Sequence, residues 1–345
     1  MRTGPALETP APARAEIPVP VPVPSAVPVP SAVPAPAPGP GPASGPALRP
    51  RSAARWPGAV LRASRPRQWP KNLRGLAAPV AGATVGRPYG IAYALVALVA
   101  FIAASSTVYL VNDVVDAERD RQHPVKRHRP IASGELPAAH ALAVAVVLTI
   151  AAISSGFWIS APGLTVTIAV YLVISFSYSL ALKHVPVVEL ACVASGFVLR
   201  ALGGAAATHV PPSGWFLTVC SLGALMVAVS KRRGELATLG DGAAGHRPVV
   251  RFYRYRPLGV VSRLLSGAMV VSYALWAVTS SGGDREIWHL ISIVPLAVAL
   301  ARFDWLSGHA DGKGVEDLII RDRIMAVAEL SWLALFAAGL LAARR

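Results

Sequence analysis

The longest uncharged stretch of the chain constrains the fold most. Residues 136–182 contain no Asp, Glu, Lys or Arg, and Ser160-Ala161-Pro162-Gly163 interrupts this run near its middle. A helix needs about 20 apolar residues to cross a bilayer, so the run predicts two membrane spans joined by a turn. Across the whole chain 54% of the residues are hydrophobic and 15% are charged, which is typical of a polytopic membrane protein rather than a soluble domain.

Further apolar runs predict an all-α membrane bundle of about nine transmembrane helices. Charged loops or Pro- and Gly-containing turns separate these runs from one another. The predicted spans are about 73–86, 91–115, the two halves of 136–182, 187–207, 215–230, 259–280, 287–303 and 324–342.

The first 55 residues differ in composition from the rest. They hold 16 of the 31 prolines in the chain, mostly in Val-Pro and Ala-Pro repeats. Proline fixes the backbone and removes a hydrogen-bond donor, so such a stretch cannot build a helix or a packed core. We expect residues 1–55 to form a disordered, Pro/Ala-rich cytoplasmic tail and residues 56–345 to form the transmembrane catalytic domain.

Positive charge is concentrated between the predicted spans. The chain has 33 Lys and Arg against 18 Asp and Glu, a net charge of +15. The basic residues lie mainly in the loops after the second and sixth spans, whereas the intervening turns carry one Arg or none. The positive-inside rule explains this distribution without a nucleic-acid partner. It predicts a multi-pass protein of the plasma membrane with its N-terminus, its charged loops and its active site on the cytoplasmic side.

Three aspartates follow the second predicted span. Asp113, Asp116 and Asp120 are spaced i, i+3 and i+7, so on a helix they share one face, and their charges repel unless a cation lies among them. Mg²⁺ prefers a few carboxylates together with substrate phosphate oxygens, so the spacing predicts a Mg²⁺ site. Lys126 and Arg127, with Arg129 beyond them, are placed to hold those phosphates. The alternative is a polar helix end followed by a solvated run of charge.

Other polar residues at membrane depth have two interpretations each. Tyr178 and Lys183 close the fourth span, where they either reach a phosphate or a ribose hydroxyl or serve as ordinary interfacial side chains. Glu189 and Arg200 lie on nearly the same face of the fifth span, as substrate contacts or as partners in an ion pair with another span. Lys231 ends the sixth span either as a positive-inside anchor or as a phosphate ligand.

These residues resemble a known family, the UbiA superfamily of intramembrane prenyltransferases. The resemblance rests on Asn112-Asp113-x-x-Asp116-x-x-x-Asp120, on the following His123-Pro124-x-Lys126-Arg127-x-Arg129-Pro130-Ile131, and on the nine-span count. It covers about 60–345. The resemblance implies a Mg²⁺-dependent transferase in which Asn112 orients a ligand or donates to phosphate beside the metal-binding aspartates.

Within the superfamily, the chain is most similar to the decaprenyl-phosphate phosphoribosyltransferases. That resemblance implies transfer of 5-phosphoribosyl from phosphoribosyl pyrophosphate to a polyprenyl phosphate, for arabinan synthesis in an actinobacterial cell envelope. Self-association into a homo-oligomer is compatible with it. The similarity lies in residues 65–72, in residues 123–131, and in Ser177-Tyr178-Ser179 through Lys183-His184 to Glu189 and Arg200. It implies substrate-binding roles for Lys71, Tyr178, Lys183, Glu189 and Arg200, and Lys231 at the end of the sixth span is a further candidate from its position and charge.

One departure from the superfamily pattern bears on the substrate. Most members carry a second D-x-x-x-D motif near the loop after the sixth span, where it helps to bind a prenyl diphosphate. This chain has Lys231-Arg232-Arg233-Gly234-Glu235 there, with Asp241 six residues beyond Glu235. The departure favours the phosphoribosyl donor over the first alternative, an enzyme that joins a prenyl diphosphate to an aromatic acceptor. The second alternative, a non-enzymatic transporter, is expected to show inverted repeats, and we find no convincing internal repeat.

Overall fold

The computed structural model describes residues 56–77, 79, 89–239, 252–253, 255–280, 284–309 and 322–342. Within these ranges the chain is helical and contains no strand. Eight of the helices are long and apolar enough to cross a membrane, which confirms the all-α membrane bundle. They are α3 (Gly90–Val115), α5 (Ala138–Trp158), α6 (Pro162–Leu180), α7 (Val188–Ala207), α8 (Gly214–Leu239), α11 (Leu258–Ser280), α12 (Asp284–Gly308) and α14 (Arg323–Ala342).

Shorter helices precede and connect the spans. The segment before α3 contains α1 (Trp56–Ala63) and the 3-10 helix η2 (Pro66–Leu76). The short helix α4 (Ala117–Arg121) follows α3, and two 3-10 turns, η4 (Lys126–His128) and η5 (Leu182–His184), lie between spans. These short elements carry five of the residues that the sequence assigns to chemistry, namely Lys71, Asp120, Lys126, Arg127 and Lys183.

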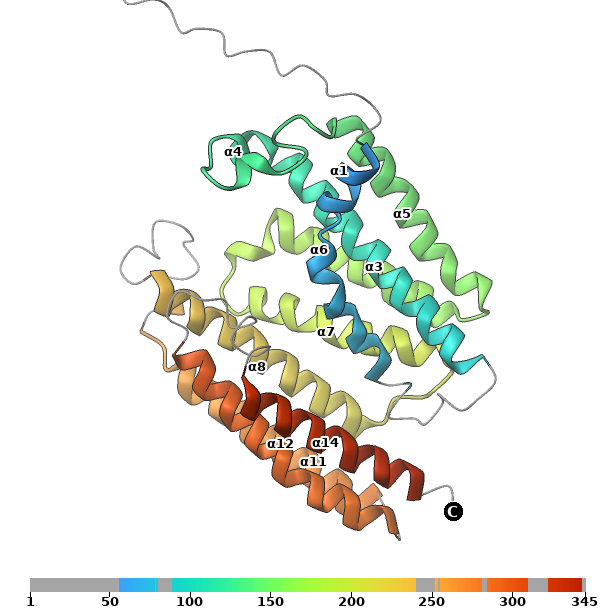
Figure 1. Ribbon diagram of the computed structural model, residues 1–345, viewed down its shortest axis with the longest axis vertical. Helices are drawn as coiled ribbons and strands as arrows, with labels where there is room; N and C mark the ends of the chain where they lie inside the picture. The colour runs from blue at the N-terminus through green and yellow to red at the C-terminus, as the bar shows by residue number, and fades with distance from the viewer. Residues whose placement is uncertain are drawn as a thin grey trace, which may run out of the picture. The chain divides into compact units, whose positions relative to one another are not determined.

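The spans pack as neighbours in two groups (Figure 1). In the first group α3 packs against α5, and α6 packs against α7. In the second group α8, α11, α12 and α14 pack together, and α7 contacts α8 to join the two. The 3-10 helix η2 lies against α3 and α7. Since successive spans run in opposite directions, the end of α3, the end of α8 and the start of α11 lie at one end of the bundle.

Small residues allow the closest contact in the first group. A Cβ added at Gly204 of α7 would overlap the carbonyl oxygen of Gly75 in η2. At Gly203 an added Cβ would overlap the ring of Phe101, which is 1% exposed in the core of this group. Without a hydrophobic force between helices in lipid, such close backbone contact is what holds spans together.

The structure corrects two predicted boundaries. The sixth span was expected to end at 230, but α8 continues to Leu239, so Lys231 and its two arginine neighbours lie on helix rather than in a loop. Charged side chains can end a span without ending the helix, because a helix can extend beyond the apolar layer. The eighth span was expected to end at 303, and α12 runs one turn further, to Gly308.

The predicted span over 73–86 lies largely outside the described residues and stays a prediction beyond them. Its first residues, 73–76, form the end of η2 and are therefore 3-10 rather than α-helical. The Pro-rich segment 1–55 also lies outside the described residues, so its disorder stays a prediction.

Candidate active site

The predicted aspartates lie where α3 gives way to α4. Asp113 is in the last turn of α3 and is 3% exposed, and Asp120 is on α4 and equally buried. Between them Asp116 caps α3, and its backbone N–H donates to the carbonyl of Asn112 at 2.9 Å. The interruption of the helix at Asp116 changes the direction of its side chain relative to the other two.

An arginine joins the two buried carboxylates. Arg129 Nη1 lies 2.6 Å from Asp120 Oδ2 and 3.1 Å from Asp113 Oδ1. Arg65, from the segment between α1 and η2, donates to the same Asp113 oxygen at 2.6 Å and stacks over the ring of Tyr109 at 4.8 Å. The basic groups thus meet the aspartates in a compact ion-pair network, which we call the Asp113 network (Arg65, Asp113, Asp120 and Arg129).

The loop that carries Arg129 is held in place from both sides. Ile131 and Leu136 are 3% and 1% exposed and pack with Leu110 of α3 in one hydrophobic cluster. Upstream, Nδ1 of His123 accepts the backbone N–H groups of Val125 and Lys126 at 3.2 and 3.3 Å. Because apolar anchors fix the loop just after Arg129, the guanidinium is positioned over the carboxylates by the fold.

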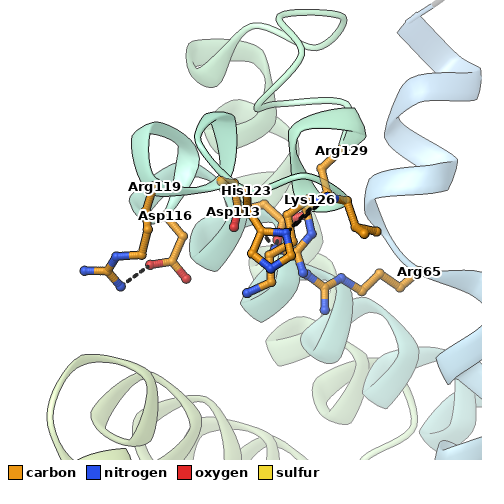
Figure 2. A network of polar contacts seen from close by, with 9 residues as sticks. Arg65, Asp113, Asp116, Arg119, His123, Lys126 and Arg129 are labelled. Carbon is orange, nitrogen blue, oxygen red and sulfur yellow. Dashed lines mark hydrogen bonds and ion pairs between the residues drawn. The ribbon is translucent and has the colours of Figure 1, made fainter. Parts of the chain in front are cut away.

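Asp116 lies apart from the Asp113 network. Its carboxylate faces Arg119 of α4 at 3.5 Å, and Figure 2 shows this pair to one side of Asp113, Arg65 and Arg129. Lys126 and Arg127 are exposed on the loop. The expected single face of three carboxylates is therefore not formed: Asp113 and Asp120 converge on one cation, and Asp116 diverges.

The donor set of this region fits Mg²⁺ in its chemistry. Three carboxylates and the Asn112 amide supply the hard oxygen ligands that Mg²⁺ takes, and a cationic guanidinium already lies between two of the carboxylates. In the present arrangement of the described side chains, no group of three or more His, Cys, Asp or Glu is close enough to hold a metal ion. Binding of Mg²⁺ would therefore require Arg129 to exchange its carboxylate partners for another anion.

Arg65 was not selected from the sequence as a site residue. It lies 48 positions before Asp113, and nothing in the spacing links the two. Its backbone has φ 53°, a left-handed conformation that costs a non-glycine residue energy unless its surroundings hold it. That unusual angle is visible only in the structure.

Glu189 has the ion pair with another span that the sequence left open. Nε of Arg232 on α8 donates to Glu189 at 2.6 Å, and a second N–H of the guanidinium contacts the other carboxylate oxygen. Glu189 is 0% exposed and Arg232 is 4% exposed. Lys231, the preceding residue, lies half-buried on the same helix.

Arg200 likewise has partners inside the protein. Its guanidinium donates to Asn72 Oδ1 at 2.7 Å and to the Tyr171 hydroxyl at 3.0 Å, and it stacks over the Tyr171 ring. Asn72 belongs to η2 and is 1% exposed. Arg200 therefore ties η2 to α6 and α7, and a substrate contact by this residue would compete with those bonds.

The remaining predicted residues lie on separate elements. Lys71 is half-buried on η2, Tyr178 is in the last turn of α6, and Lys183 is in η5. Separately, α6, α7 and α8 border an open apolar cavity of about 340 Å³. Its lining includes Ile174, Ala194, Val198, Ser221 and Leu225.

Comparison with known sequences places this site in a family. The sequence model of the UbiA prenyltransferase family matches residues 75–318, which is most of the chain and includes the aspartates and their basic loop. The chain belongs to the UbiA prenyltransferase family. The family resemblance drawn from the Asp motif is thereby confirmed.

Curated members of this family are similar over most of the chain. The decaprenyl-phosphate phosphoribosyltransferase of Mycobacterium tuberculosis is 39% identical over 280 residues, which cover 80% of this chain and 92% of that protein. The enzyme of the same name from Corynebacterium glutamicum is 36% identical, covering 79% of this chain and 84% of that protein.

Solved UbiA structures share the fold. A UbiA homolog from Archaeoglobus fulgidus bound to GPP and Mg²⁺ superposes with a TM-score of 0.62 at 16% identity, covering 82% of this chain and 98% of that one. A digeranylgeranylglyceryl phosphate synthase gives a TM-score of 0.61 at 14% identity, covering 83% of this chain and 98% of that one. At such low identity the likeness concerns the arrangement of helices alone.

Proposed function

We propose that this protein transfers the 5-phosphoribosyl group of phosphoribosyl pyrophosphate to decaprenyl phosphate or a similar polyprenyl phosphate, releasing pyrophosphate. The observation that carries the proposal is the 39% identity to an enzyme named for this activity over nearly its whole length. The basic residues at the end of α8, in place of a second acidic motif, also favour it over use of a prenyl diphosphate.

The reaction exchanges one bond at ribose C1 for another. The bond from C1 to the pyrophosphate oxygen breaks, and an oxygen of the lipid phosphate forms the new bond to C1. That attacking oxygen is already anionic, so no strong general base is needed and we assign none. The protein must chiefly bind two anionic substrates close together and stabilise the charge that develops on the leaving pyrophosphate.

The Asp113 network suits this task because its cations can change partners. Arg129 and Arg65 are 29% and 33% exposed at their side chains, while the carboxylates they contact are 4% exposed. An incoming pyrophosphate offers oxygens that planar guanidinium groups bind in a fork. Lys126 and Arg127, exposed on the same loop, would add countercharge.

Mg²⁺ is the proposed cofactor, and Asp113, Asp116 and Asp120 with Asn112 are the residues that would hold it. When bound it supplies positive charge to the leaving pyrophosphate. Solved UbiA homologs with bound Mg²⁺ support this assignment. For the ribose and its 5-phosphate we propose Lys71, Tyr178, Lys183 and Lys231, together with Glu189 and Arg200 once their present partners are exchanged.

The lipid chain needs an apolar surface that opens among the spans. We propose the cavity between α6, α7 and α8 for its first isoprene units, because apolar atoms make up nearly all of its lining. The positive loops favour an orientation with the site facing the cytoplasm from the plasma membrane, where phosphoribosyl pyrophosphate would be available. The product is then proposed to feed arabinan synthesis in the cell wall.

The deciding experiment is a membrane assay with radiolabelled phosphoribosyl pyrophosphate, decaprenyl phosphate and Mg²⁺. We expect label in the lipid extract, lost on chelation with EDTA and lost in Asp116→Ala. Turnover of a prenyl diphosphate with an aromatic acceptor, without labelled lipid from the phosphoribosyl donor, would overturn the substrate assignment. Label held inside proteoliposomes without any lipid product would indicate transport instead.

A further inference from the structure

A second charged cluster lies at the same end of the bundle, on helices that do not carry the Asp113 network. Arg233 of α8 donates to a carboxylate oxygen of Asp304 on α12 at 2.9 Å and to the Asp304 backbone carbonyl at 3.2 Å. Arg263 of α11 lies 3.9 Å from the other carboxylate oxygen, which is beyond hydrogen-bond distance. The Arg263 side chain is 62% exposed.

These three residues line one end of a cavity of about 560 Å³ between α8, α11 and α12. Trp305 and His309, which stack with ring centroids 4.4 Å apart, lie at the same end. Tryptophan is enriched at the level of the lipid headgroups. The rest of the lining is apolar or small and consists of Ser266, Gly267, Val270, Ala297, Leu300 and Ala301.

The apolar part of the cavity continues onto a surface that faces outward. Leu264 and Val271 on α11 are 68% and 58% exposed, and Val294 and Val298 on α12 are 66% and 44% exposed. In a protein with this many apolar spans, such a face is in contact with lipid chains. The cavity therefore joins a cationic end at the membrane surface to the hydrocarbon layer.

The charge of the cluster selects among anionic ligands. Among the described residues of the cluster, one aspartate against two arginines leaves one positive charge in excess, and the arginine farther from Asp304 is the exposed Arg263. A phosphodiester carries one negative charge and would neutralise this excess. A phosphomonoester carries about −1.5 to −2 at pH 7 and would leave the cluster negative. A free phosphate has no apolar part, so the apolar side chains of the lining would not contribute to its binding.

We propose that the cavity between α8, α11 and α12 binds a membrane phospholipid with an anionic phosphodiester headgroup. The headgroup phosphate accepts from Arg263, Asp304 keeps Arg233 in place, and an acyl chain lies along Gly267, Val270 and Ala297. Basic pockets between transmembrane helices are a recurrent way of binding anionic headgroups. This site is separate from the proposed transfer reaction and does not depend on it.

Two single substitutions test the site through its two halves. Arg263→Gln removes the positive charge that the cluster has in excess. Gly267→Leu places an apolar side chain in the groove, and its Cβ has room because a Cβ at Gly267 meets no atom within 4 Å. The matched control is Arg62→Gln, which removes an equally exposed arginine from α1, where it pairs with Glu135.

The measurement is native mass spectrometry of the full-length protein in detergent with phosphatidylglycerol, with zwitterionic phosphatidylcholine as the reference lipid. We expect wild type and Arg62→Gln to retain phosphatidylglycerol in preference, and Arg263→Gln to retain it about tenfold more weakly, as for loss of one charged hydrogen bond. Gly267→Leu should lower retention of both lipids. Unfolding temperatures near that of the wild type establish that each variant is folded. If Gly267→Leu does not fold, Arg263→Gln alone tests the proposal.

Unchanged retention of phosphatidylglycerol in Arg263→Gln would overturn the proposal. A second result would also overturn it: equimolar decaprenyl phosphate displaces phosphatidylglycerol from wild type, and Arg263→Gln no longer binds decaprenyl phosphate. That result would assign the groove to the phosphomonoester lipid.

Discussion

Two arginine–carboxylate groups at the same end of the bundle differ in how far their arginines are exposed. In the pair of Glu189 and Arg232, both side chains are almost fully buried; a guanidinium fork faces the Glu189 carboxylate, and a further N–H of Arg232 contacts the partly exposed Glu235 on the same helix. In the Asp113 network the carboxylates are equally buried, but the arginines are about one-third exposed and one of them serves two acids. Burial of both partners makes a pair that has to open before Glu189 can contact substrate, whereas burial of the acids alone leaves cations that can turn to an incoming anion.

The largest effect is expected from opening the closed pair. Glu189→Gln leaves the buried charge of Arg232 with the partly exposed Glu235 as its remaining ion-pair partner among the described residues, so we expect a loss of about 3 kcal/mol in the free energy of unfolding, the lower end of the range for breaking a buried pair. Chemical unfolding in detergent measures it. Arg62→Gln, which breaks an exposed pair, is the control and should cost less than about 1 kcal/mol. Equal free energies of unfolding for Glu189→Gln and wild type would contradict the distinction between the Glu189–Arg232 pair and the Asp113 network.

The next effect concerns turnover rather than stability. Asp113→Asn keeps the size of the side chain but removes a charge from the network, and we expect phosphoribosyl transfer to fall by about 10²–10³-fold. The protein should still insert and unfold close to the wild-type temperature, because Arg129 retains Asp120. Glu118→Gln on α4 is the matched control, since its exposed carboxylate pairs only with Arg121 among the ion pairs of the described residues. Wild-type turnover in Asp113→Asn would exclude the assigned role.

A smaller effect is expected from the exposed loop. Lys126→Ala removes countercharge for the donor, so the KM for phosphoribosyl pyrophosphate should rise about tenfold, the worth of one charged contact, with little change in kcat. Steady-state kinetics at varied donor concentration give both constants. A fall in kcat at unchanged KM would move Lys126 from donor binding to the stabilisation of the leaving group.

The smallest effect concerns a third pair, which lies near the membrane surface. Hydrogen bonds from Arg302, and from the backbone N–H of Met325, hold the pKa of Asp322 below its usual value of about 4. A lowered carboxyl pKa stabilises the fold above the pKa of the unfolded chain, and this stabilisation is lost as the pH falls through the folded pKa.

Asp322→Asn should therefore lower the unfolding temperature slightly at pH 7. The difference from wild type should shrink as the pH falls through the folded pKa of Asp322. A difference that grows on acidification would contradict the sign of the shift.

The spans were predictable because a bilayer demands long apolar runs, and the predicted ends of α3, α6 and α7 fall within two residues of those observed. The closeness of Asp113, Asp120 and Arg129 was also predictable, since all lie within 17 residues of one another, whereas their roles in binding stay a prediction. The pairs of Arg65 with Asp113 and of Glu189 with Arg232 join residues 48 and 43 positions apart, and helix packing decides them. Local periodicity contains no information about which helix becomes a neighbour.

The direct backbone contact between Gly75 and Gly204 sets an order of events during biosynthesis. η2 leaves the ribosome about 130 residues before the part of α7 against which it docks. At typical rates of translation that interval is on the order of ten seconds. During it, Asn72 lacks the guanidinium of Arg200, and η2 lacks its packing contact with α7. A nascent chain arrested before residue 204 should therefore insert its first spans and still leave η2 open to protease.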